Sequence, residues 1–454
     1  MTVLPDPSDA RLEDHRRELL TEAWAQIKVE RLRDLVVGMV DIPSPTGAEA
    51  VLAQWLTGRL EDAGLHASYQ AIDDEQGNAT GRLRGGGTGP DLLLYAPIDT
   101  LTVGTAEEDV PWVGPELRPD LCPRAVVEGD YVMGLGAANP KAHAACVVAA
   151  AEAVAAAGIP LTGDLLVGLG AGGMPVNKRE VERVRRYNAG QGNGCSFLLE
   201  QGFWADYAVI AKPGWATAWE EVGLCWFELS VHGTYHYVGS RHRMPYRNPI
   251  VDAAKVVEGL ERWFPQYSAA HTDGLVAPQG HIGSIRGGWT KTAAVSPATC
   301  RLRVDLRTNP RSSVNDVRRE FGAAIDEIRA AHPGLDVDWE LVLAIPGTST
   351  PVDNWVCRAS VAAWEQITGR PHEPIADTSG ATDANILRLR GIPTARIGMD
   401  RIGPGAPLPL DFPSGMNVAD VREMERLTRH LVHMIINTCT RERAECAAMP
   451  TEKA

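Results

Sequence analysis

The sequence lacks the long apolar run that a membrane-spanning helix needs, since no stretch approaches the roughly 20 apolar residues required. No basic segment followed by an apolar run stands near the first residue, which predicts that no secretory signal is present. The eight cysteines are scattered and none forms a C-x-x-C pair. We therefore expect reduced thiols and a cytoplasmic protein.

Basic residues are also in deficit. The 44 Lys and Arg residues stand against 58 Asp and Glu, and the formal net charge is −14. This acidic balance disfavours nucleic acid and anionic membranes as partners. The motifs G-x-S-x-G and H-E-x-x-H and the phosphate-binding P-loop are absent as well. The sequence therefore indicates none of the hydrolases or nucleotide-binding proteins that carry those motifs.

What the chain has is the composition of a globular protein, with 44% hydrophobic and 22% charged residues over 454 positions. Such a length allows two or three domains. Helical periodicity predicts helices over 9–41, 48–63, 141–157 and 418–439. Short apolar runs at 91–96, 165–169 and 207–211 predict buried strands, and their alternation with helices favours an α/β layer with a largely parallel sheet.

The pattern changes near Glu221. Residues 225–231 and 299–307 alternate between apolar and polar side chains, as half-exposed strands do, and helical segments at 249–263 and 313–331 follow them. We predict an α/β fold in which a large catalytic-type domain, residues 1–222 and 335–454, is interrupted by a small α+β lid domain at residues 223–334.

Several short motifs, in this order, resemble one family. They are Ile42-Pro-Ser-Pro-Thr-Gly-Ala-Glu49, Gly77-Asn-Ala-Thr-Gly, Gly89-Pro-Asp-Leu-Leu-Leu-Tyr-Ala-Pro-Ile-Asp99, Gly134-Leu-Gly-Ala-Ala-Asn-Pro-Lys141, Val231-His-Gly-Thr-Tyr-His236, Asn248-Pro-Ile, Arg286-Gly-Gly288, Asp305-Leu-Arg307, Thr382-Asp-Ala384 and Gly391-Ile-Pro-Thr394. The set resembles the dizinc peptidases and deacylases, which include acetylornithine deacetylase, succinyl-diaminopimelate desuccinylase, aminoacylase and glutamate carboxypeptidase. The resemblance covers nearly the whole chain.

The chain departs from that family at the residues that would hold zinc. The resemblance implies a histidine at Pro97, a bridging aspartate at Asn139, an acidic ligand at Lys212 and a final histidine near Phe412. It also implies a Glu-Glu pair after the next strand, but no Asp or Glu lies between Asp164 and Glu180, and no His lies between 373 and 429. Because zinc needs three or four acidic, His or Cys ligands, we predict no metal and no other cofactor.

Asp99 is the one expected carboxylate that survives, and Lys212 replaces another. We predict that the two form a pair and that the Lys212 ammonium stabilises the oxyanion of a substrate carbonyl, as a metal would. The alternative is a buried ion pair that only compensates charge and carries no catalysis.

For three further candidate site residues, the sequence allows a functional role and a structural alternative. We predict His143 as an acid or base, or a helix-end histidine with an ordinary hydrogen bond. The resemblance implies that His236 reaches the site of a partner subunit and stabilises the oxyanion; the alternative is an interface histidine. The resemblance implies that Arg307 belongs to the lid and lies near a substrate carboxylate; the alternative is a strand-face arginine paired with Asp305 or a neighbour. Further substrate-binding candidates are Asn139, Lys141 and Asn248.

Three kinds of function stay open. The first is a metal-independent enzyme that hydrolyses a C–N bond, amide or ureide, of a small carboxylate-bearing substrate. The second is an enzyme repurposed for condensation, cyclisation or elimination, and the third is a non-catalytic ligand-binding or partner-binding protein. The predicted partners are a small-molecule substrate and a second copy of the chain, because the resemblance implies a homodimer formed through the lid domain.

Overall fold

The computed structural model describes residues 3–176, 178–181, 184–400, 402 and 405–447. The chain forms two compact units. The smaller comprises Glu220–Ser349 and Ile375–Ala381, and the larger comprises Val3–Trp219, Thr350–Pro374 and the chain from Thr382 on. The predicted fold class, α/β with an inserted α+β unit, is confirmed.

The larger unit is built on a six-stranded sheet in the order β1-β2-β6-β3-β9-β18. Its strands are β1 (His66–Ala71), β2 (Gly77–Leu83), β3 (Leu92–Pro97), β6 (Leu165–Gly170), β9 (Tyr207–Ala211) and β18 (Thr394–Ile397). The four strands β6, β3, β9 and β18 run parallel, whereas β1 and β2 complete the sheet in antiparallel pairing. The three strands predicted from apolar runs, β3, β6 and β9, lie in the middle of this sheet. They are apolar on both sides because a parallel sheet is covered on both faces.

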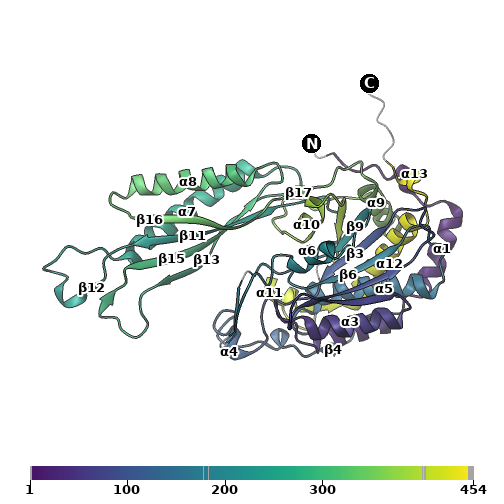
Figure 1. Ribbon diagram of the computed structural model, residues 1–454, viewed down its shortest axis with the longest axis horizontal. Coiled ribbons are helices and arrows are strands. Elements are labelled where there is room, and N and C mark those ends of the chain that lie inside the picture. The colour runs from purple at the N-terminus through teal and green to yellow at the C-terminus, as the bar shows by residue number, and fades with distance from the viewer. Residues whose placement is uncertain (1–2, 177, 182–183, 401, 403–404, 448–454) are drawn as a thin grey trace, which may run out of the picture. The chain divides into compact units, whose positions relative to one another are not determined.

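Helices cover both faces of this sheet (Figure 1). Leu93 and Tyr95 of β3 pack in one core with Leu198 of α6 (Asn193–Glu200) and Leu387 of α10 (Ala384–Leu389). On the opposite face β3 meets α5 (His143–Ala156) and α12 (Val421–Cys439). The alanine side chains of α5 let its backbone approach the sheet closely.

The remaining larger helices are α1 (Asp14–Trp24), α2 (Val29–Val40), α3 (Ala50–Asp62) and α9 (Trp355–Thr368). The segment 9–41 was predicted as continuous helix and is instead two helices. Lys28 before α2 has extended backbone angles, and the break lets Leu20 on α1 and Leu35 on α2 each face the core. Short strands β4 (Val126–Glu128), β5 (Tyr131–Met133) and β19 (Val418–Asp420) form a separate small sheet.

The smaller unit is an antiparallel sheet in the order β13-β15-β11-β16, with two helices on one face (Figure 1). Its elements are β11 (Gly223–His232), α7 (Pro249–His271), β13 (Gly280–Gly287), β15 (Thr299–Thr308), α8 (Val314–Ala331) and β16 (Val337–Ile345). Phe227 of β11 stacks on Phe321 of α8 with ring centres 3.9 Å apart, at the centre of this core.

This unit extends further along the chain than the predicted lid of residues 223–334. The strand β16 was assigned by sequence to the large domain, but it pairs with β11 from Leu224↔Ile345 to Val231↔Val337. The alternation of buried and exposed residues along β16 is that of a half-covered strand, which belongs in this sheet and not in the parallel one.

Two further observations concern the cysteines and the helices. All eight cysteines are free thiols. None of the helices in the described ranges is long and apolar enough to cross a membrane.

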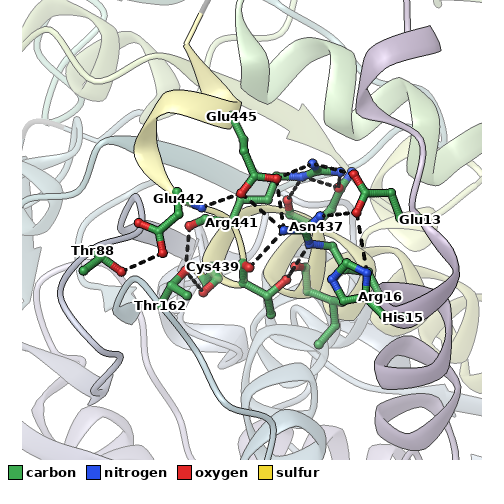
Figure 2. A network of polar contacts seen from close by, with 12 residues as sticks. Glu13, His15, Arg16, Thr88, Thr162, Asn437, Cys439, Arg441, Glu442 and Glu445 are labelled. Carbon is green, nitrogen blue, oxygen red and sulfur yellow. Dashed lines mark hydrogen bonds and ion pairs between the residues drawn. The ribbon is translucent and has the colours of Figure 1, made fainter.

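A network of charges fastens the last part of the chain to the first (Figure 2). Arg16 of α1 and Arg441, just after α12, are both almost completely buried. Glu445 of α13 (Arg443–Cys446) lies 3.1 Å from each guanidinium, and Glu13 lies 2.9 Å from Arg16 and 3.8 Å from Arg441. Two buried cations are thereby held by two carboxylates.

We predict that Glu445→Ala destabilises the protein by roughly 2–3 kcal/mol, because it leaves two buried guanidinium groups with only Glu13 as an acidic partner. Urea unfolding measures this loss. Asp14→Ala is the control: its ion pair with Arg17 is exposed on both sides, so its removal should cost at most about 1 kcal/mol. Equal losses from both variants would contradict the account.

Candidate active site

The residues singled out by sequence lie where the central parallel strands of the larger unit end. Asp99 lies two residues after the end of β3, and Lys212 lies directly after β9, which is the neighbouring parallel strand. Parallel strands end at the same edge of a sheet, and this edge is where open α/β sheets bind ligands. The sequence-predicted pair is therefore brought to one place by the topology.

Asp99 is fully buried and hydrogen-bonded on both oxygens. Its Oδ1 accepts from the Gly173 N–H at 2.8 Å, and its Oδ2 accepts from the Met174 N–H at 2.9 Å and from the Thr46 hydroxyl at 2.7 Å. Burial raises the pKa of Asp99, while these three donors and the charge of Lys212 act in the opposite direction. Lys212 thus lies close enough to act on Asp99 electrostatically.

Lys212 also contacts the second position that the resemblance marks. Its Nζ donates to Asn139 Oδ1 at 3.2 Å, and its backbone N–H donates to the carbonyl of Ile397 at the end of β18. The side chain is almost entirely buried. The structure therefore brings Asp99, Asn139 and Lys212 together, as three residues from three segments far apart in sequence.

A second buried carboxyl group, which sequence reasoning did not assign, stands beside Asp99. Glu49 Oε1 accepts from the N–H groups of Gly47 at 2.9 Å and Gly172 at 3.0 Å, and from Gln76 Nε2 at 3.3 Å. Its Oε2 is buried and has no hydrogen-bond partner. Burial, together with the charge of Asp99, raises the pKa of Glu49 to about 8.

The opening-loop motif contained the signal for this residue, since Glu49 closes the run from Ile42. What the sequence did not indicate is its partner. Gly172 lies in the loop that lost the expected acidic pair, 123 residues further along the chain. A second buried pair lies beside the same loop: the Tyr95 hydroxyl donates to Asp383 Oδ2 at 2.7 Å, and Gly173 approaches both Pro97 and Asp383.

His143 and Lys141 lie next to this site, but their surroundings differ from those predicted. The His143 Nδ1–H donates to the Ala138 carbonyl at 2.7 Å, and Nε2 accepts from the Met399 N–H at 3.3 Å. Burial and the charge of Lys212 lower the pKa of His143 to about 3. Both nitrogens are occupied and the ring is neutral, so the alternative of a structural histidine fits and the acid–base role does not.

Lys141 is fully buried, and its Nζ donates to the Ile42 carbonyl at 3.0 Å. Burial lowers the pKa of Lys141 to about 7, although Asp41 opposes the shift. A side chain enclosed in this way supports the opening loop and is not placed to bind substrate. Phe412, near which a final ligand was expected, has a side chain outside the described part of the chain.

Three candidates belong to the smaller unit. His236 is largely buried, stacks on Tyr246 with ring centres 5.1 Å apart, and has Nε2 3.4 Å from the Ser240 hydroxyl. Arg307 pairs with Asp305 at 2.9 Å, which is the alternative that the sequence allowed.

Asn248 has a local function that the sequence prediction missed. Its Oδ1 accepts from the Ile250 N–H at 3.0 Å, and the residue caps α7. This is the typical use of Asn before a proline at the first helical position. We therefore withdraw the substrate-binding assignment of Asn248.

The dizinc centre that the resemblance implies does not fit the residues present. Both Asp99 oxygens already accept hydrogen bonds, three in total. Asn139 is neutral and accepts from an ammonium, and Lys212 would repel a dication. Within the described ranges, no cluster of three or more His, Cys, Asp or Glu side chains is arranged to hold a metal ion. We assign no metal ligand at this site.

Comparisons with known proteins agree with the fold. No family model matches the chain. The chain is 22% identical over 325 residues to N-formyl-4-amino-5-aminomethyl-2-methylpyrimidine deformylase of Bacillus subtilis (strain 168), and the match covers 68% of each protein.

Solved structures extend the likeness over nearly the whole chain. Human carnosine dipeptidase 1 matches with a TM-score of 0.67 and 13% identity, over 93% of this chain and 99% of that one. An M20 family metallo-carboxypeptidase from Sulfolobus solfataricus matches with a TM-score of 0.64 and 13% identity, over 90% and 99%. The chain thus has the M20 metallopeptidase fold, and the resemblance read from the motifs is confirmed at this level.

Proposed function

We propose that the protein hydrolyses an amide-type C–N bond, amide or ureide, of a small molecule without a metal ion, and that the Lys212 ammonium replaces the metal. The observation that carries the proposal is the placement of Lys212 and Asp99 at the ends of two neighbouring parallel strands. The M20-type fold and the deformylase likeness support amide-type chemistry, because those relatives are named for cleaving C–N bonds.

The charges of the site suit that reaction. As water adds to the carbonyl carbon, the carbonyl oxygen gains negative charge, and an ammonium directed at it lowers the barrier. The attacking water gives up a proton as its oxygen bonds to carbon. The C–N bond then breaks, and that proton goes to the departing nitrogen, so the products are a carboxylic acid and an amine. Asp99 keeps Lys212 protonated throughout, since a neighbouring carboxylate favours the charged form of a lysine.

The smaller unit is proposed to contribute through a homodimer. Its edge strand β13 exposes most of its length, and Tyr235, Tyr237 and Trp289 expose more than half of their surfaces (66%, 59% and 57%). An exposed edge strand and exposed aromatic rings are features that a second copy would cover. We retain His236 as the residue that this unit is proposed to offer to a partner's site.

Light scattering at micromolar concentration tests the dimer. We expect a mass of twice the 49.0 kDa chain. Trp289→Asp, which places a charge within the exposed aromatic surface, should shift the protein toward the monomer. A wild-type mass of a single chain would contradict the dimer.

Lys212→Met tests the catalytic proposal once a screen of N-acyl and N-carbamoyl compounds has found a substrate. The variant removes the oxyanion partner, so turnover should fall by roughly 10²–10³-fold, the scale of losing one oxyanion donor. It also leaves Asp99 buried without its neighbouring cation, and breaking such a pair costs about 3–5 kcal/mol. Turnover and urea unfolding are the two measurements.

The double variant Lys212→Met with Asp99→Asn separates catalysis from stability. If the pair is catalytic, the double variant stays as inactive as Lys212→Met, because the ammonium is still missing. Its stability returns only in part, because Asp99→Asn removes the uncompensated charge but sets an amide NH2 against donors that Asp99 accepted from. Recovery of wild-type turnover by the double variant would make the pair scaffolding and refute the proposed role of Lys212.

A further inference from the structure

The loop at residues 172–174 binds two carboxyl groups with three successive backbone N–H groups. Gly172 donates to Glu49, and Gly173 and Met174 donate to Asp99. Both carboxyl groups are fully buried. Donors that are adjacent in sequence hold their acceptors close together, and two adjacent buried carboxylates repel each other strongly.

The two groups are not equivalent. Asp99 has partners on both oxygens and the charge of Lys212 nearby, all of which favour its ionised form. Glu49 has its donors on Oε1 alone, and Oε2 is enclosed without a partner. An ionised oxygen buried without a donor is costly, whereas a protonated one carries no charge. The geometry therefore places a proton on Glu49.

We propose that Glu49 is a positioning residue of this site. As a neutral carboxylic acid it shares the 172–174 loop with Asp99 and so leaves Asp99 as the ionised partner of Lys212. The proposal rests on the proposed function of Lys212 and Asp99. Ionisation of Glu49 would add a second negative charge beside Asp99 and set two carboxylates against each other on the same loop. That repulsion would displace Asp99 from its donors.

Two titratable groups act on Glu49 directly, Asp99 after β3 and Tyr69 on β1. Asp99 in turn interacts with the charge of Lys212 after β9 and with Tyr95 of β3, whose hydroxyl donates to Asp383 before α10. Tyr69 and Tyr95 both have raised pKa values, caused first by burial, so neither adds charge near neutral pH. Which of the two carboxyl groups carries the negative charge therefore depends on the loop donors that they share and on Lys212 beside Asp99.

The variant Glu49→Gln tests this without any substrate, because an amide imitates the protonated acid at all pH values. The folded-state pKa of Glu49, about 8, lies above its unfolded value of about 4.3. The stability that the proton gives wild type is thus complete below about pH 4.3 and is lost as pH rises through about 8. Across this pH range, the folding constant of Glu49→Gln divided by that of wild type should therefore rise with pH, by up to about tenfold per pH unit.

Melting temperatures of both proteins at pH 5, 6, 7 and 8 measure the effect. The difference, variant minus wild type, should increase steadily with pH. Glu152→Gln is the matched control, since the Glu152 carboxylate pairs with the Arg31 guanidinium at 2.6 Å, and its loss should lower the melting temperature at every pH. A flat or falling difference for Glu49→Gln would overturn the proposal.

Once a substrate is known, turnover provides a second test. Wild-type turnover is expected to decline above about pH 8, and Glu49→Gln should match wild type at pH 6 and lack that decline. Loss of turnover at pH 6 in a folded Glu49→Gln protein would refute a positioning role. If Lys212→Met leaves turnover unchanged, the proposed function fails, while the melting temperatures still decide the protonation of Glu49.

Discussion

The arrangement of this site depends on the backbone of residues 172–174, in the loop between β6 and β7 (Lys178–Val181). In the corresponding stretch the resemblance implies a Glu-Glu pair, one a general base and one a metal ligand. Here the stretch supplies N–H groups to carboxyl groups that come from elsewhere. Gly172 adopts a positive φ of 63°, and a Cβ on Gly173 would lie 2.4 Å from Pro97, so two glycines are needed for the loop to approach β3. N–H donors stand where the resemblance implies carboxylates, and this arrangement is consistent with the proposed metal-free centre.

The rest of the larger unit serves to hold that centre rigidly. Parallel pairing of β3 with β9 places Asp99 and Lys212 on one edge, and the alanine-rich α5 brings His143 against the loop after β18. His143 and Lys141 are buried and hydrogen-bonded to carbonyls of neighbouring segments. Hydrogen bonds of this kind hold the backbone segments around the site together.

The sequence predicted much of this arrangement where the signal is local or topological. Three central strands follow from short apolar runs, and the pairing of Asp99 with Lys212 follows from the resemblance, which puts both at expected ligand positions; the order of the strands comes from the structure. Prediction failed where a contact joins distant segments. Glu49 was part of a motif, but its partner Gly172 is specified only by the folded loop. The assignment of β16 to the large domain failed because its pairing with β11 is likewise long-range, and Asn248 was assigned by resemblance when its local role as a helix cap sufficed.

The most direct test of the central claim, that an ammonium and not a metal organises this site, is the metal content of the protein purified without chelators. Elemental analysis should find zinc and other divalent metals far below one equivalent per chain, and added zinc should leave the melting temperature unchanged. One or two equivalents of zinc per chain, released by a chelator together with a loss of stability, would contradict the account.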